Sequence, residues 1–167
     1  VGLSACQSIP TADPYDLAGK SHSAVTPADR AHVDWWMPRH EQVLERIRQG
    51  NVELIMLGDS ITHGWERNGK DWWDQYYAPR NAVNMGFGGD RTQHVLWRLQ
   101  NGEVDGIRPK LAVLMIGTNN SNSDPAEEVA DGIKAVCAEI RLRLPRTKIL
   151  VLAIFPRAMG SREQREL

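Results

Sequence analysis

Hydrophobic residues along the chain gather in short continuous runs, separated by longer stretches of helical spacing. The runs span residues 53–57, 81–85, 111–116 and 148–155. They are rich in Ile, Leu and Val and do not alternate with polar residues, which is typical of strands covered on both faces. Strands that recur roughly every 30 residues with helices between them form βαβ units. The pattern therefore predicts an α/β fold with a parallel sheet sandwiched by helices.

One long helix is expected before the first strand. Thr26 is a suitable N-cap and Pro27 fits the first helical position. Apolar residues then continue at three- and four-residue spacing as far as Ile47. Pro38 interrupts this spacing, so the sequence predicts either a kink or two helices end to end.

Helical stretches also follow each of the first three strands. Those at residues 71–77 and 92–100 are short, and Asp90 is the expected cap of the second. The third is expected to be capped by Asp124 and to end at Pro145. These stretches complete the predicted βαβ units.

The length fits a single domain. A chain of 167 residues removes roughly 70% of its unfolded surface from water on folding. We expect one folded domain over residues 27–167, preceded by a polar N-terminal tether over residues 1–26. No apolar run approaches the roughly 18 residues of a membrane-spanning helix.

Charged residues are balanced in number and spread along the chain. Lys and Arg number 20 and Asp and Glu number 21, which gives a formal net charge of −1. No block of like charge is present. This argues against nucleic acid as the main partner and against electrostatic binding to an anionic membrane.

The two cysteines are too few for a disulfide framework and lack metal-ligand spacing. Cys137 falls on a helical apolar stripe and is expected to be a small core residue. Cys6 ends the tetrapeptide Leu-Ser-Ala-Cys, which resembles a bacterial lipobox. Two interpretations stay open: a lipid anchor at Cys6 with an extracytoplasmic (periplasmic or membrane-anchored) protein, or an incidental cysteine in a cytoplasmic one.

Chemically useful residues follow each of the first three predicted strands. The first run leads into Gly-Asp-Ser at residues 58–60, the second into Gly-Phe-Gly-Gly-Asp at 86–90, and the third into Gly-Thr-Asn-Asn at 117–120. Ligands of parallel sheets bind outside the carboxyl ends of the strands. We therefore expect a nucleophile, a glycine-rich turn and a carboxamide to meet at one edge of the sheet.

This set of residues suits ester hydrolysis. The Ser60 hydroxyl can attack a carbonyl carbon when a base removes its proton. The glycines at 88 and 89 let the backbone approach a ligand and donate an N–H, and the Asn119 amide can donate a second hydrogen bond. Together with the Ser60 N–H they would form an oxyanion hole.

The same residues resemble those of the SGNH (GDSL) hydrolases, a family of serine esterases and lipases. The stretch NMGFGGDRTQHVLWRLQNG at residues 84–102 is more specific. It resembles the catalytic subunits of the brain-type platelet-activating factor acetylhydrolase and their bacterial relatives, and the similarity extends over residues 53–157. The resemblance implies a flavodoxin-like three-layer α/β/α sandwich, hydrolysis of short acyl esters, and neither metal nor cofactor.

The resemblance also implies roles for single residues. Ser60 would be the nucleophile, and Gly89 and Asn119 would donate hydrogen bonds to the oxyanion. Asp59 would order the turn around the serine and would not be the triad acid.

One block of the family pattern has no counterpart here. Family members carry an Asp-x-x-His block whose His is the base, whereas the last histidine of this sequence is His94. Ser161 and Gln164 read as a capping box for a helix that is not completed. We therefore expect a C-terminally incomplete domain that lacks its last βα unit, with the base on missing residues or on another chain, as in a homodimer or a complementing pair. The fourth strand would then be a bare apolar edge.

Several residues near the predicted site allow two interpretations. His63 is close to Ser60 in the sequence and is expected to be a polar residue at the edge of the site rather than its base. Trp65 either walls the substrate pocket or packs in the core, and Arg91 either contacts a substrate anion or pairs with neighbouring residues. Trp35 fits the stripe of the first helix and is expected in the core.

Two functions remain open from the sequence. The first is a serine esterase that removes a short acyl group, such as acetyl, from a carbohydrate or lipid through an acyl-enzyme on Ser60. The second is a non-catalytic binding or assembly module that keeps the pocket without a base. Phosphate binding by the glycine turn is disfavoured, because the run lacks the Lys-Ser/Thr pair of a P-loop.

Overall fold

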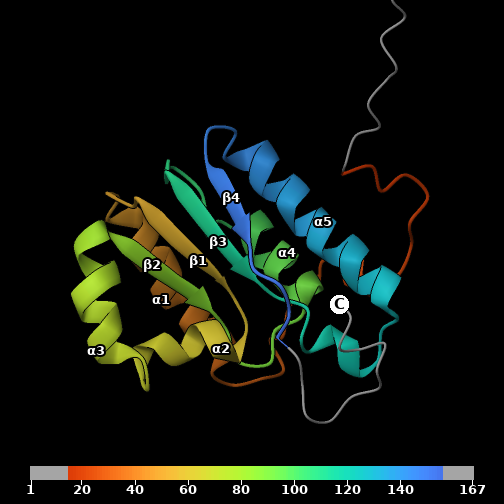
Figure 1. Ribbon diagram of the computed structural model, residues 1–167, viewed down its shortest axis with the longest axis horizontal. Coiled ribbons are helices and arrows are strands. Elements are labelled where there is room, and N and C mark those ends of the chain that lie inside the picture. Colours follow the sequence, from red (N-terminus) through yellow and green to blue (C-terminus); the bar gives the residue numbers. More distant parts are fainter. Residues whose placement is uncertain (1–14, 156–167) are drawn as a thin grey trace, which may run out of the picture.

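Four parallel strands form the centre of the fold in the computed structural model, which describes residues 15–155 (Figure 1). They are β1 (Leu54–Gly58), β2 (Ala82–Gly86), β3 (Leu111–Met115) and β4 (Lys148–Val151), in the order β2-β1-β3-β4. The predicted parallel α/β fold is confirmed, and each strand begins within one residue of its expected start. The fourth strand ends earlier than expected, at Val151.

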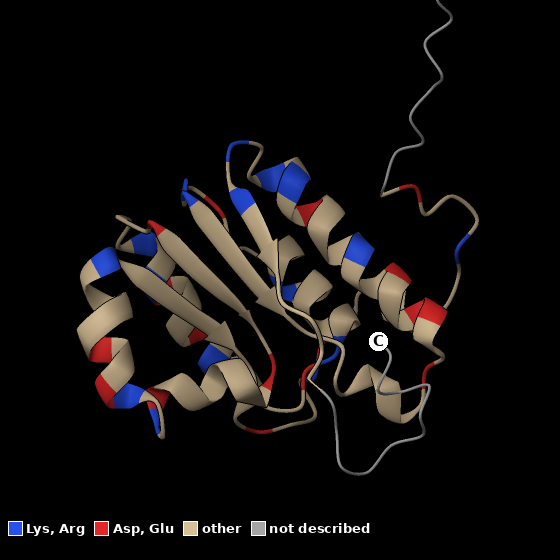
Figure 2. Cartoon of the chain, viewed as in Figure 1, with Lys and Arg blue, Asp and Glu red and all other residues tan. Residues whose placement is uncertain are grey.

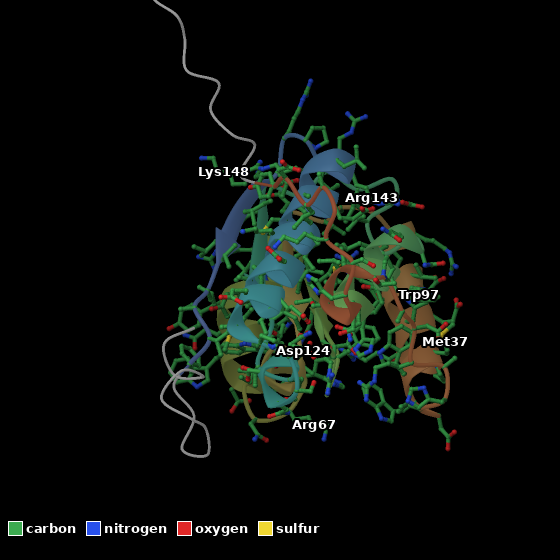
Figure 3. All side chains as sticks on the ribbon, turned by 90° about the vertical axis from the view of Figure 1, so that its right-hand side faces the viewer. Met37, Arg67, Trp97, Asp124, Arg143 and Lys148 are labelled. Carbon is green, nitrogen blue, oxygen red and sulfur yellow. The ribbon has the colours of Figure 1, made fainter. Side chains whose placement is uncertain are left out.

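Three longer helices pack against one face of the sheet and lie behind it in Figure 1. They are α1 (Trp36–Arg48), α4 (Thr92–Gln100) and α5 (Ala126–Arg143). Alternate strand residues point into the core that these helices close, among them Ile55, Leu57, Val83, Met85 and Leu114. From the side, Met37 of α1 and Trp97 of α4 lie together on the helical side of the molecule, away from Lys148 (Figure 3).

Short helical elements connect the remaining segments. The β1–β2 connection contains α2 (Ser60–His63), a 3-10 turn (Gly64–Glu66), α3 (Lys70–Trp72), a π-helical turn (Trp73–Tyr77) and a second 3-10 turn (Ala78–Arg80). Two further 3-10 turns are formed by Ser23–Val25 and Asn120–Asn122. The helical stretch predicted at 71–77 is thus present, divided between α3 and the π-helical turn.

The central strands of the sheet are apolar and buried, whereas the end strand β4 is exposed. All five residues of β1 are buried, and Figure 2 shows β1, β2 and β3 without charged residues. On β4, however, Leu150 is 47% exposed and Val151 45% exposed. The expectation that every strand is covered on both faces is wrong for β4, because the described helices cover only the face on which Ile149 packs.

The first helix begins later than the sequence predicts. It starts at Trp36, so Thr26 and Pro27 do not open it and Pro38 lies in its first turn. A proline there causes no kink, since the N–H groups of the first turn have no partner within the helix. Residues 27–35 instead form a path of turns across the domain, on which the Ala28 N–H donates to the Gln93 carbonyl at 3.2 Å.

Both predicted aspartate caps are wrong. The N–H of Arg91, at the start of α4, donates to Nδ1 of His94 at 2.9 Å, and Asp90 is buried with other partners. The Asp124 carboxylate accepts from Asn120 Nδ2 at 2.8 Å, and α5 begins after Pro125 without a side-chain cap. In each case the carboxylate accepts hydrogen bonds from side chains instead of from the N–H groups of the helix end.

The N-terminal tether reaches into the described part of the chain at residues 15–26, and there it packs on the domain. Ala24 is fully buried, and its carbonyl accepts from the Thr92 hydroxyl at 2.8 Å. Lys20 forms an ion pair with Asp131 of α5 at 2.9 Å. The predicted lipobox cysteine Cys6 and the capping box at 161–164 lie outside the described residues. Between residues 15 and 155, no helix has the length and apolarity needed to cross a membrane.

Two glycines beside α2 provide a matched test of this packing. A Cβ at Gly86 would lie 2.2 Å from the His63 nitrogen and 2.6 Å from the Thr62 carbonyl carbon. We expect Gly86→Ala to lower the free energy of unfolding by about 3 kcal/mol, because backbone atoms of α2 must move. Urea titration followed by circular dichroism measures the change.

Gly64→Ala is the control for this variant. Gly64 has helical backbone angles, and a Cβ there would meet no atom within 4 Å. Its free energy of unfolding should stay the same or rise by roughly 0.4–1 kcal/mol. Equal stabilities for the two variants would contradict the close packing of α2 on the strand ends.

Candidate active site

The carboxyl ends of three strands meet at one edge of the sheet. Gly58, the last residue of β1, is in register with Gly86 of β2 and Met115 of β3. The Phe87 N–H donates to the Gly58 carbonyl at 3.0 Å, which joins the first two loops directly. In the sheet, β2 lies on one side of β1 and β3 lies on the other side. The order of the strands therefore reverses at β1, and a topological switch point lies between β1 and β3.

Asp59 sets the turn that carries Ser60. Its side chain is 1% exposed, and its Oδ1 accepts from the Ile61 N–H at 2.9 Å as the N-cap of α2. Ser60 is therefore the first residue of a helix that starts at the strand edge, and it is exposed. This geometry agrees with the predicted role of Asp59 in ordering the turn around Ser60.

The glycine turn, Phe87–Asp90, is a tight reversal next to this helix. The Asp90 N–H donates to the Phe87 carbonyl at 3.1 Å, and Gly89 has a φ of 77°. A positive φ at the third position defines a type II turn and favours glycine there. The Gly88 N–H points toward Nδ1 of His63 at 3.3 Å, which links the turn to α2.

Asn119 lies against the same turn. Its Nδ2 donates to the Asp90 carbonyl at 2.8 Å. A carboxamide nitrogen carries two N–H groups, so this bond orients the side chain and leaves the other N–H for a ligand. The structure thus brings together Asn119 and the backbone after Gly89, as the sequence predicts.

Asn120 holds this arrangement in place, and its role was not predictable beyond its place in the Asn-Asn pair. Its Oδ1 accepts from the Thr92 N–H at 2.9 Å and its Nδ2 donates to Asp124 at 2.8 Å. Arg91 donates to the Ser123 hydroxyl at 2.9 Å. This bond ties the turn to the loop after β3, and the predicted contact of Arg91 with a substrate anion stays a prediction.

A buried ionic network lies beneath the glycine turn. The Asp90 carboxylate accepts from Trp36 Nε1 at 2.8 Å, from Arg98 Nε at 3.0 Å and from Arg30 Nη1 at 3.3 Å. Burial raises the pKa of Asp90, and the Arg98 charge and the hydrogen bonds of Trp36, Arg98 and Arg30 oppose this. A buried carboxylate is tolerated when donors surround it in this way.

The network continues away from the site. Arg98 is fully buried, donates to the Met85 carbonyl at 3.2 Å and pairs with Glu103. Glu103 also bonds Nδ1 of His40 at 2.8 Å. Arg98 was not predicted as a functional residue, although a charged residue inside an apolar helical stripe is a signal of such a role.

The Phe87 ring lies between two guanidinium groups. Arg98 is 3.9 Å and Arg39 is 5.0 Å from the ring centroid. Arg39 also donates to the Gly86 carbonyl at 2.8 Å and forms a two-bond ion pair with Glu66 at 2.7 and 2.9 Å. These cation–π and hydrogen-bond contacts fix the strand end from which the glycine turn starts.

Trp35 lies elsewhere than expected, whereas the interpretation of Trp65 stays open. Trp35 is 41% exposed, and its ring lies beside Gly88 and 5.8 Å from His63, so the expectation of a core position is wrong. The cause is the late start of α1, which leaves Trp35 outside the helical stripe. Trp65 packs against Gly69 and Tyr77, and its predicted contact with substrate stays a prediction.

The described histidines have hydrogen-bond partners other than the Ser60 hydroxyl, or none. His63 is partly buried, and burial and the Arg39 charge lower its pKa. His40 is bound to Glu103 and His94 to the Arg91 N–H. Within residues 15–155, none of the five histidines forms a hydrogen bond with Ser60, and no three His, Cys, Asp or Glu side chains are grouped to hold a metal ion.

Comparison with known proteins gives a consistent match. The sequence profile of the GDSL-like lipase/acylhydrolase family matches residues 56–167. Platelet-activating factor acetylhydrolase IB subunit alpha2 of Rattus norvegicus is 38% identical over 142 residues, 83% of this chain and 61% of the relative. Subunit alpha1 of Homo sapiens is 38% identical over 153 residues, 90% of this chain and 65% of the relative. The chain thus spans less than two thirds of the length of either subunit.

Solved structures share the fold. A GDSL-like lipase from Bacteroides thetaiotaomicron superposes with a TM-score of 0.53 at 19% identity, covering 68% of this chain and 54% of the other. The SGNH-hydrolase family esterase AlinE4 gives a TM-score of 0.52 at 23% identity, covering 70% and 67%. The resemblance predicted from residues 84–102 is confirmed.

The site has a titratable group that makes stability depend on pH. Burial, followed by the charges of Arg30, Arg98, Arg91 and His32, lowers the pKa of His94 from 6.5 to about 3. The folded state therefore keeps His94 neutral while the unfolded chain binds a proton below pH 6.5. Stability is full above that pH and falls with acidification toward pH 3, by about 2 kcal/mol between pH 7 and pH 5.

His94→Gln isolates this contribution. Glutamine at this third helical position can still accept from the Arg91 N–H, but it does not titrate. Urea unfolding at pH 7 and pH 5 should give a smaller loss for the variant, by about 2 kcal/mol. The same pH dependence in both proteins would show that His94 is protonated in the folded state.

Proposed function

Because the chain belongs to the GDSL-like lipase/acylhydrolase family, we propose that the protein hydrolyses short acyl esters at the Ser60 hydroxyl. The observation that carries this proposal is the hydrogen bond of 2.8 Å from Asn119 Nδ2 to the Asp90 carbonyl. It joins the loops after β2 and β3 at the edge where α2 presents Ser60. The proposed nucleophile and the two proposed oxyanion donors thus come from three loops at one edge of the sheet.

Ser60 is the proposed nucleophile. Its Oγ forms a bond to the ester carbonyl carbon while its proton goes to a base, and the carbonyl oxygen becomes an oxyanion. The alcohol leaves when the tetrahedral intermediate collapses, taking a proton from the protonated base. Water then attacks the acyl-serine in the same manner, releasing the acid and restoring the hydroxyl.

Three donors are proposed to stabilise the oxyanion. They are the N–H groups of Ser60 and Gly89 and the second N–H of the Asn119 amide. Their positions are set before substrate arrives, by the Asp59 cap, the type II turn and the bond to the Asp90 carbonyl. Donors that need no reorganisation contribute most to transition-state stabilisation.

The base is proposed to come from outside these 167 residues. His63 is nearest to Ser60 in sequence, but its Nδ1 accepts from the Gly88 N–H and its pKa is lowered. The family pattern instead supplies a histidine from an Asp-x-x-His block, which this sequence does not contain. A further segment or a second chain would provide it.

The proposed substrate is an acetyl or similarly short ester of a lipid or carbohydrate. The name of the relatives, platelet-activating factor acetylhydrolase, supports an acetyl group. Trp35 and Ile61, which we call the rim residues, are 41% and 44% exposed beside the glycine turn and Ser60. Exposed apolar side chains at this position suit the organic part of an alcohol.

A binding module without catalysis is the second candidate. The observation in its favour is that no histidine of the described chain bonds Ser60. Such a module would bind esters through the same amide donors and leave them intact.

Covalent labelling separates the two candidates. We expect a fluorophosphonate probe to label the protein as the cell makes it, including any segments that flank these 167 residues, and we expect p-nitrophenyl acetate to be hydrolysed. Ser60→Ala should abolish both, because no other hydroxyl has the same position. An intact protein that binds the ester but is never labelled would favour the binding module.

Asn119→Ala tests the oxyanion donors. Loss of one donor should lower kcat roughly 100- to 1000-fold, with a smaller change in KM. Asn101→Ala is the matched control, since Asn101 Nδ2 also donates to a backbone carbonyl, of Trp97 at 2.7 Å, but at the far end of α4. An unchanged kcat in Asn119→Ala would remove Asn119 from the proposed mechanism.

A further inference from the structure

Arg30 reaches the glycine turn from a segment far away in the sequence. Its Nη1 donates to the Gly88 carbonyl at 2.8 Å and to Asp90 Oδ1 at 3.3 Å. Its guanidinium lies on the side of Gly89 where a Cβ would be, with Nη1 and Nη2 each 3.1 Å from that position. The side chain is 18% exposed, so it forms a wall of the turn that solvent can still reach.

The bond to the Gly88 carbonyl determines the direction of the next N–H. A trans peptide is planar, and its C=O and N–H point in opposite directions. All described peptide bonds are trans. With the Gly88 carbonyl directed at Arg30, the Gly89 N–H points away from Arg30.

Gly88 and Gly89 have no intrinsic preference for this orientation of the peptide between them. Type I and type II turns share the closing hydrogen bond and differ mainly in the direction of the central peptide. Glycine adopts positive and negative φ with similar ease, so the Gly88–Gly89 peptide has no steric preference. An external contact must select the type II form that the φ of 77° at Gly89 defines.

We propose that Arg30 is the positioning residue that holds the Gly88–Gly89 peptide so that the Gly89 N–H faces the substrate oxyanion. This rests on the proposed function of the site. Arg98 and Arg39 bind the neighbouring carbonyls of Met85 and Gly86, and neither bonds the Gly88 carbonyl. Arg30 therefore controls the one peptide of the turn whose direction matters for catalysis.

The turns formed by residues 27–35 place Arg30 beside the glycine turn. Asp29 Oδ1 accepts from the Ala31 N–H at 3.0 Å, and the Val33 N–H donates to the Arg30 carbonyl at 2.8 Å, so Arg30 sits within consecutive turns. The sequence pattern predicts a helix here, which would have given Arg30 a different direction. The departure from helix thus has a functional consequence.

Arg30→Ala in the full protein tests the proposal. We expect kcat for p-nitrophenyl acetate to fall roughly 10- to 100-fold with KM nearly unchanged, because a misdirected donor weakens transition-state binding only. Millimolar guanidinium should restore part of kcat by occupying the partly exposed site. In isotope-labelled protein, the amide to α-proton couplings of Gly89 should change from those of a fixed positive φ to an average over two turn forms.

Arg46→Ala is the matched control. Arg46 is also partly buried and donates through Nη1 to a glycine carbonyl, that of Gly50 at 2.8 Å, but it lies on α1 away from the turn. It should leave kcat and the Gly89 couplings unchanged, with or without guanidinium.

The outcomes separate the two proposals. If the unaltered protein is active and Arg30→Ala keeps its kcat, the positioning role is overturned. A loss of kcat without guanidinium rescue and with unchanged Gly89 couplings overturns it as well, because Arg30 would then act only in folding. If the unaltered protein is inactive, the proposed function fails, and the Gly89 couplings alone decide whether Arg30 orients the peptide.

Discussion

The buried carboxylate of Asp90 is the constraint on which the site depends. A charge away from water must be surrounded by donors, and here Trp36, Arg98 and Arg30 provide them. These donors come from α1, α4 and the segment before α1. The chain can satisfy Asp90 only when all three are in place, so the position of the glycine turn is tied to the completion of the helical layer.

Arginine side chains also bind the backbone carbonyls at the end of β2. Arg98, Arg39 and Arg30 bind the carbonyls of Met85, Gly86 and Gly88 in turn. These three arginines are themselves paired with Glu66, Asp90 and Glu103, so the charges at this strand end balance.

The sequence predicted what depends on local pattern. Continuous apolar runs located the four strands, and the parallel topology alone was enough to place Ser60, Gly89 and Asn119 at one edge. Side chains that bond across more than fifty residues were not predictable: Asp90 was expected to cap a helix, and Arg30 was not considered. The predicted core position of Trp35 was wrong for a related reason. Apolar spacing does not distinguish a helix from a series of turns when long-range contacts, such as that of Ala28 with Gln93, decide between them.

The close contact of α2 with the sheet sets how deep Ser60 lies at the strand ends. At Gly58 and Gly86 the helix touches bare backbone, so the depth of Ser60 relative to the strands is set by the absence of side chains. Trp35 and Ile61 project into solvent and have no such neighbours on their exposed sides. Substitutions of Trp35 or Ile61 would therefore change the surface around Ser60 while leaving its depth at the strand ends unchanged.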